Sequence, residues 1–210
     1  MIKAFIFDMD GTVVDSTEND YNAWQKAFKE YGTTMPYDEF LSLLGAKGDE
    51  IVKKYLDISK EQTDEFLDNK EKYFFKFCDD KPLKFIDGVD VFLSKVKSKD
   101  ISTALATGSG KEKLDFIFSK LDFKKYFDAV LSADDISYGK PNPEIFVKAA
   151  KKLNVQPNDA LIFEDAARGV EAASNAGMLC TAITSTHSKS LLKNASYIIE
   201  SYANFDWSII

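Results

Sequence analysis

Six short apolar runs recur along the chain, and each is continuous rather than alternating in polarity. Runs of this kind are typical of strands whose sheet is covered by helices on both faces. The strands predicted in this way are residues 2–7, 101–106, 129–131, 160–163, 181–183 and 197–199. Stretches with helical spacing lie between most of them, so the pattern predicts a parallel α/β sheet. The carboxyl ends of its main strands would meet at one edge, where open α/β sheets bind ligands.

The stretch from residue 16 to residue 83 breaks this alternation because it shows helical periodicity alone. Apolar side chains recur there at three- and four-residue spacing, as in Trp24, Ala27 and Phe28. The stretch leaves the sheet after the first strand and returns before the second, so both connections would lie beside the ligand edge. We therefore expect an α/β core of residues 1–15 and 84–210, and an all-helical cap of residues 16–83 over that edge.

Charge and composition narrow the range of partners. Lys and Arg number 27 against 34 Asp and Glu, which gives a net charge of −7 and no basic surface for nucleic acid or an anionic membrane. We expect a small-molecule partner, with no nucleic acid and no membrane. Charged residues interrupt the N-terminal apolar stretch, which predicts a cytoplasmic protein. Cys78 and Cys180 have neither disulfide-framework nor zinc-site spacing, and we expect two buried, reduced thiols.

Acidic pairs follow two of the predicted strands. Asp8 and Asp10 come directly after the first, and Glu164 and Asp165 follow the fourth. If both strands are central, these carboxylates meet at one edge, and such a set of hard oxygen ligands suits Mg²⁺. The alternatives are an acidic turn around Gly11 in the first case and capping of the following helix by Asp165 in the second.

Two further segments carry candidate chemistry. Thr107, Gly108 and Ser109 follow the second main strand and precede a helix, which makes them an anion site or a plain turn. Lys140 lies in a loop stiffened by prolines, where its ammonium could pair with the acids and with phosphoryl oxygens, or could be an ordinary solvated lysine. His187 has no triad partner, and we interpret it as a surface or loop residue.

Taken in order, these segments resemble the four motifs of the haloacid dehalogenase superfamily of phosphotransferases. The resemblance spans essentially the whole chain and extends to the β-phosphoglucomutase and phosphoglycolate phosphatase-like subgroup, with a Rossmann-like core and an inserted helical cap. The motifs are Asp8-Met9-Asp10-Gly11-Thr12, Thr107-Gly108-Ser109, Gly139-Lys140-Pro141 and Glu164-Asp165.

The resemblance implies a role for each motif residue. Asp8 would be the nucleophile that takes the phosphoryl group, and Asp10 the acid that protonates the leaving oxygen and then the base that activates water. Thr107 and Lys140 would contact the phosphoryl oxygens. Gly108 and Ser109 would help to bind the phosphate. Mg²⁺ would be held by Asp8, the backbone carbonyl of Asp10, Glu164 and Asp165.

The cap departs from the sugar-phosphate mutase pattern. The histidine expected in the first cap helix is replaced by Asp20, and the segment of residues 45–50 has no arginine to hold a second phosphate. Lys47 or Lys70 could substitute as substrate contacts. Because a mutase must retain a bisphosphate intermediate, these losses favour hydrolysis.

The leading hypothesis is therefore a monomeric, Mg²⁺-dependent phosphatase of small phosphorylated metabolites that works through an aspartyl-phosphate intermediate. A sugar-phosphate mutase is the alternative, and a phosphometabolite-binding protein without turnover is a third. Dehalogenation of haloacids is a fourth, against which Asp10 and Asp165 argue because that reaction needs neither a metal nor a second motif acid.

Overall fold

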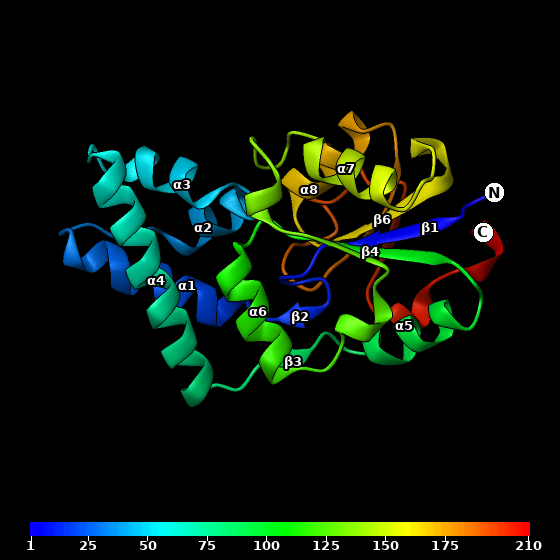
Figure 1. Cartoon of the computed structure of the whole chain (residues 1–210), viewed down its shortest axis with the longest axis horizontal. Helices are drawn as coiled ribbons and strands as arrows, with labels where there is room; N and C mark the ends of the chain where they lie inside the picture. Colours follow the sequence, from blue (N-terminus) through cyan, green and yellow to red (C-terminus); the bar gives the residue numbers. More distant parts are fainter.

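The six predicted strands form one parallel sheet in the computed structural model, which describes residues 1–210 (Figure 1). The strand order is β5-β4-β1-β6-β7-β8. The strands are β1 (Ala4–Phe7), β4 (Ser102–Ala106), β5 (Ala129–Leu131), β6 (Ala160–Glu164), β7 (Leu179–Ile183) and β8 (Tyr197–Ile199). All neighbouring pairs in this sheet are parallel, which confirms the predicted α/β class.

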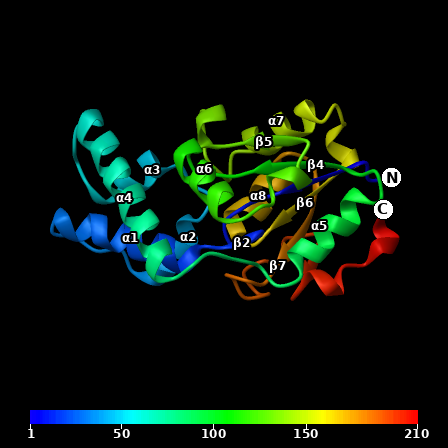
Figure 2. The ribbon, with the colours of Figure 1, turned by 60° about the horizontal axis from the view of Figure 1, so that its bottom comes forward.

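Helices cover both faces of this sheet (Figures 1 and 2). Side chains alternate between the faces along each strand, so Phe5 and Phe7 of β1 enter one apolar cluster and Ile6 enters the other. The first cluster also contains the apolar stripes of α5 (Val89–Lys97) and α6 (Lys111–Lys120). The second contains those of α7 (Glu144–Lys152) and α8 (Ala167–Asn175). Burial on both faces explains why the strand sequences are continuously apolar.

The sheet order fixes where the loops emerge. β1 pairs with β4 on one side and with β6 on the other, so these three strands form the middle of the sheet. The segments that follow them begin at residues 8, 107 and 165, at the same carboxyl edge. This is the arrangement in which open α/β sheets carry their ligand sites.

Between Asp15 and Lys84 the chain forms four helices that lie together at one end of the molecule (Figures 1 and 2). They are α1 (Thr17–Glu30), α2 (Tyr37–Leu43), α3 (Gly48–Tyr55) and α4 (Lys60–Asp80). Their apolar faces form a separate cluster that includes Trp24, Phe28, Phe40 and Phe66. The division into a core and a cap of residues 16–83 stays a prediction, and we call residues 16–83 the helical insert below.

Two short strands that the sequence pattern does not reveal join the helical insert to the rest of the chain. β2 (Val14–Asp15) and β3 (Lys84–Phe85) pair in antiparallel fashion where the chain enters and leaves the insert. The chain's two crossings therefore lie side by side. Five single 3₁₀ turns complete the elements: residues 124–126, 133–135, 157–159, 202–204 and 207–209.

Two smaller expectations also have outcomes in the structure. Cys78 and Cys180 are both buried and form no disulfide, as predicted. None of the helices combines the length and the apolar character that crossing a bilayer requires.

Candidate active site

Asp8 and Asp10 leave the middle of the sheet directly after β1. The backbone N–H of Asp8 still donates to the carbonyl of Phe163 at 3.0 Å, which continues the pairing with β6 and holds Asp8 beside the end of that strand. Gly11 follows with φ +76°, a left-handed conformation that favours glycine. A side chain at this position would also collide with the Asp165 carboxylate. The turn at Gly11 is thus real, but it packs against a second acid rather than facing solvent.

The carboxylates of Asp8, Glu164 and Asp165 converge at this edge. One oxygen from each lies within 4.8 Å of the others, and all three residues are buried. The ammonium of Lys140 lies 2.5 Å from Asp8 Oδ1 and also pairs with Glu164. Three buried acids therefore face one buried ammonium.

This excess of acid shifts the protonation of the cluster. Burial is the main cause that raises the pKa of Asp8 well above its ordinary value, and Glu164 and Asp165 add to it while Lys140 opposes it. Burial, together with the charge of Glu164, raises the pKa of Asp165 to about 7. Buried carboxylates of this density need a cation or protons. The donor set, three hard carboxylate oxygens, fits Mg²⁺.

Hydrogen bonds fix the two acids at the end of β6. Thr12 donates to Asp165 Oδ1 at 2.8 Å, and Thr186 donates to the other oxygen of the same carboxylate. Glu164 Oε2 accepts from the backbone N–H groups of Asp165 and Ala166, both at 2.9 Å. The alternative that Asp165 caps α8 is wrong, because the residue at the N-cap is Ala166 and no side chain bonds there.

The segment after β4 lies beside these acids. The backbone N–H of Ser109 donates to Thr107 Oγ1 at 3.0 Å, and Ser109 Oγ donates to Asp10 Oδ2 at 2.7 Å. Ser16 donates to Asp10 Oδ1 at 2.5 Å. The turn at residues 107–110 therefore does more than connect a strand to a helix, since it orients Asp10, whose carboxyl is separate from the three-acid cluster.

Lys140 is 1% exposed, so the interpretation as a solvated lysine is wrong. Its backbone N–H donates to the carbonyl of Gly45 in the helical insert at 3.0 Å, and Arg168 of α8 donates to its carbonyl. Both contacts hold the backbone while the ammonium reaches Asp8 and Glu164. The loop thus positions the lysine by main-chain contacts.

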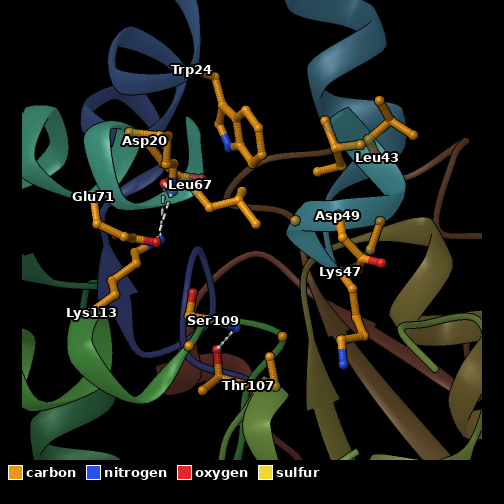
Figure 3. Close-up of a pocket in the computed structure, with 18 of the residues that line it drawn as sticks. Asp20, Trp24, Leu43, Lys47, Asp49, Leu67, Glu71, Thr107, Ser109 and Lys113 are labelled. Atoms are coloured by element: carbon orange, nitrogen blue, oxygen red, sulfur yellow. Dashed lines mark hydrogen bonds and ion pairs between the residues drawn. The ribbon is translucent and has the colours of Figure 1, made fainter. Parts of the chain in front are cut away.

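A cavity of about 850 Å³ opens between the carboxyl edge of the sheet and the helical insert (Figure 3). Its wall contains every predicted site residue except Lys140, which lies behind Asp8. The insert contributes apolar side chains such as Trp24, Leu43 and Leu67, whereas the sheet edge contributes Thr107 and the acids. The arrangement can hold an anion at the sheet edge with its organic remainder toward the insert.

The two cap lysines proposed from the sequence both reach this wall. The ammonium of Lys47 donates to the carbonyl of Ile136 at 2.8 Å, which ties the insert to the loop after β5. Lys70 is buried and lies 2.5 Å from Asp20 Oδ1. Their roles as substrate contacts stay predictions, but the charge of Lys70 is already matched by an acid.

Sequence reasoning did not identify Lys113 of α6, which is 2% exposed and lies 3.0 Å from Asp10 Oδ1 and 3.1 Å from Asp20 Oδ1. Burial by itself lowers the pKa of Lys113, but Asp10 and Asp20 together raise it above its ordinary value. A signal was available, because Lys113 adjoins Leu114 and Ile117 on the apolar side of its helix. A lysine in that position needs a buried acid.

His187 lies in a loop, one of the two placements expected from the sequence, and is only 6% exposed. Its Nδ1 lies 2.9 Å from Thr186 Oγ1, the hydroxyl that donates to Asp165. The ring therefore lies next to a residue that contacts the acidic cluster. No local sequence pattern predicts this placement.

Comparison with known proteins connects this site to a family. A family model described as "Haloacid dehalogenase-like hydrolase" matches residues 5–183. The chain is 28% identical over 211 residues to validoxylamine A 7'-phosphate phosphatase of Streptomyces hygroscopicus subsp. limoneus, covering 99% of this chain and 97% of that protein. It is 33% identical over 184 residues to a phosphorylated carbohydrates phosphatase of Thermotoga maritima, covering 84% and 82%. Among solved structures, β-phosphoglucomutase of Clostridium difficile superposes with a TM-score of 0.88 at 27% identity, covering 100% of this chain and 95% of that one.

Proposed function

Because the chain belongs to the haloacid dehalogenase-like hydrolases, we propose that it is a Mg²⁺-dependent phosphatase that acts through an aspartyl-phosphate intermediate. Hydrolysis of phosphoric monoesters is the activity of the named phosphatases to which it is similar. The observation that supports the mechanism is the buried cluster of Asp8, Glu164 and Asp165 with Lys140 at the end of the cavity. Such a cluster brings a nucleophile and a cation site to one place.

The first half of the reaction belongs to Asp8. One carboxylate oxygen forms a bond to phosphorus while the ester P–O bond breaks, and the leaving oxygen takes a proton from Asp10. Lys140 offsets the negative charge of Asp8 as the anionic phosphoryl group approaches. Thr107 donates its hydroxyl to a phosphoryl oxygen, with Gly108 and Ser109 beside it on the cavity wall.

The second half reverses the role of Asp10. Its carboxylate takes a proton from water, the water oxygen attacks phosphorus, and the bond from phosphorus to Asp8 breaks to release phosphate. Ser16 and Ser109 donate to the two oxygens of Asp10 and hold it toward the cavity. One residue can serve both halves because it ends the first half deprotonated.

The residues fit Mg²⁺ as the cofactor. Asp8, Glu164, Asp165 and the backbone carbonyl of Asp10 would hold it. When bound, the ion neutralises charge on the phosphoryl oxygens and on the attacking carboxylate. The raised pKa values of Asp8 and Asp165 express the same need for a cation in the buried cluster.

The cavity favours a monophosphate with a neutral remainder. Its wall contains lysines but neither arginine nor histidine, and its acids outnumber its lysines. Lys70 and Lys113 are engaged by Asp20, which removes two of the six wall lysines from the groups that could bind a second phosphate. Small phosphorylated compounds, sugar phosphates among them, are therefore the substrates we propose. We further propose that residues 16–83 act as a cap that closes over them, in a monomeric, cytoplasmic protein.

Sugar-phosphate mutase activity is the second candidate, favoured by the structural similarity to β-phosphoglucomutase. Against it stands Asp20, an acid in the helix where the resemblance leads us to expect the mutase histidine, engaged with two lysines. A protein that binds phosphometabolites without turnover is a weaker candidate, because Asp8, Asp10 and Lys140 are all present and in contact with partners.

The test measures inorganic phosphate released from a panel of phosphate monoesters with Mg²⁺ or with EDTA. Phosphate release that needs Mg²⁺ and no added bisphosphate supports the phosphatase. Isomerisation of a sugar phosphate that needs a sugar bisphosphate supports the mutase instead. Binding of substrates that stabilises the protein without either reaction supports the non-catalytic alternative.

A further inference from the structure

Helix α1 begins at the active site in an unusual way. Ser16 occupies the N-cap position of α1, where a serine normally accepts a hydrogen bond from the first turn of the helix. No such bond forms, and the hydroxyl donates instead to Asp10 Oδ1 at 2.5 Å. Asp20 follows one turn later on the same helix and is buried. The start of α1 therefore contacts Asp10 directly through Ser16 and carries a buried acid one turn later.

Four side chains of alternating charge connect Asp10 to the helical insert. The order is Asp10, Lys113, Asp20 and Lys70, with N–O distances of 3.0, 3.1 and 2.5 Å between successive members. Asp10 and Lys113 belong to the sheet-bearing part of the chain, whereas Asp20 and Lys70 belong to α1 and α4. Figure 3 shows Lys113 extending from α6 toward Asp20 at the side of the cavity. We call these four residues the ion network.

Lys113 is the member of the ion network that joins Asp10 to Asp20, in addition to balancing the charge of the second acid. Asp20 already has Lys70 at 2.5 Å, and Asp10 already accepts hydrogen bonds from Ser16 and Ser109. Burying an additional ammonium is costly because it loses its hydration. What only Lys113 provides is a link between the two carboxylates, since its ammonium alone pairs with the side chains of both Asp10 and Asp20.

We propose that Lys113 is a positioning residue that aligns the Asp10 carboxyl for proton transfer and couples this alignment to the position of α1 through Asp20. The inference rests on the proposed function, in which Asp10 is the acid and base. With α1 in place, Asp10 Oδ1 accepts a hydrogen bond from the Ser16 hydroxyl and pairs with the Lys113 ammonium. If the insert moves away, Ser16 and Asp20 leave together and Asp10 loses its alignment. Proton transfer would thus be efficient only when the insert covers the site.

The test compares Lys113→Met with Lys113→Arg, and uses Lys120→Met as a matched control. Lys120 lies on the same helix, is exposed and contacts only the exposed Asp79 and the Phe116 ring. Lys113→Met should fold, because each acid it abandons keeps another partner. Melting temperatures check this, and Lys113→Gln replaces the methionine variant if that variant is unfolded at the assay temperature.

Two substrates separate alignment of Asp10 from general damage. kcat/KM reports the steps up to departure of the leaving group, which needs a proton when the group is an alkoxide and hardly needs one when it is p-nitrophenolate. We expect Lys113→Met to lower kcat/KM by about 100-fold for the best alkyl phosphate of the panel but by less than about fivefold for p-nitrophenyl phosphate. Lys113→Arg should recover most of the alkyl activity, and Lys120→Met should match the wild type on both substrates.

Asp20→Asn tests the coupling to α1. If Asp20 acts through Lys113, the double variant with Lys113→Met should be no slower than Lys113→Met alone on the alkyl substrate. Effects that multiply overturn the coupling. Equal losses on both substrates, or no loss in Lys113→Met, overturn the positioning role while leaving the phosphatase intact. A wild-type protein that releases no phosphate overturns the proposed function and this inference with it.

Discussion

Replacing Lys140 by methionine tests whether its ammonium stabilises the folded protein by offsetting the charge of the buried acidic cluster. Methionine keeps the length of the side chain but leaves the carboxylates of Asp8 and Glu164 without their shared cation. Both acids are buried, with side-chain exposures of 9% and 1%. Removing one partner of a buried ion pair costs about 3–5 kcal/mol, because the remaining charge is desolvated and unpaired.

That loss is large, but a domain whose total free energy of unfolding is about 5–15 kcal/mol should remain folded after it. For a chain of this size it corresponds to a fall in Tm of roughly 6 to 20 °C. The measurement is thermal or urea unfolding in EDTA, which removes metal ions as a source of compensation. Lys148→Met is the control, because Lys148 pairs with Glu144 at the surface and its loss should cost less than about 1 kcal/mol.

The difference in stability between the wild type and Lys140→Met should depend on pH in a definite direction. Burial lowers the pKa of Lys140, but Asp8 and Glu164 together raise it above the ordinary value of 10.5, so the ammonium stays charged and its contribution is lost only at higher pH. In the variant, Asp8 loses the cation that opposes the rise of its pKa, and protonation of Asp8 relieves the unpaired charge. The stability gap should therefore narrow as pH falls from about 8 to about 5. A Tm within about 2 °C of the wild type at neutral pH would refute the reasoning.

Three further outcomes follow from the site. Asp10→Asn should lower kcat for alkyl phosphates by about 10²- to 10⁴-fold, and an unchanged kcat would remove Asp10 from proton transfer. EDTA should abolish phosphate release, with recovery on adding Mg²⁺ in excess; full activity after exhaustive chelation would contradict a metal role. Asp20→Asn should destabilise the protein at pH 7 in urea titrations. Burial raises the pKa of Asp20, but Lys113 and Lys70 outweigh it and hold the pKa below its ordinary value of 3.8, so the wild type should lose this advantage only as pH falls below that value. A gap that closes already at about pH 6 would show that the ion network does not hold in solution.

The sheet was predictable because its strands are buried on both faces, and such strands have continuously apolar sequences. All six runs are strands, within one or two residues at their ends. The acids were predictable for a related reason, since a carboxylate directly after a buried strand has no solvent to enter and must meet a cation. Parallel pairing of β1 with β6, in which Phe7 lies opposite Phe163, then brings Asp8 beside Glu164 and its neighbour Asp165.

What the sequence does not reveal depends on contacts between distant segments. Strands β2 and β3 are two residues each, too short to show any periodicity. Lys113 approaches Asp20 from 93 positions away along the chain, and the contact forms only in the folded chain, where α4 packs against both α1 and α6. His187 is buried through its neighbours rather than through a pattern of its own. Lys140 was recognised as a candidate, but its main-chain bonds to Gly45 and Arg168 required the folded chain.

The central claim, that Asp8 takes the phosphoryl group, is tested most directly by trapping the intermediate. Wild-type protein and Asp8→Asn are mixed with the best substrate of the panel and Mg²⁺, quenched in acid within one turnover, and mapped by peptide mass spectrometry. We expect phosphate on Asp8 in the wild type, and neither label nor phosphate release in Asp8→Asn, with both proteins equally folded. Turnover by Asp8→Asn, or a label on another residue, would contradict the account.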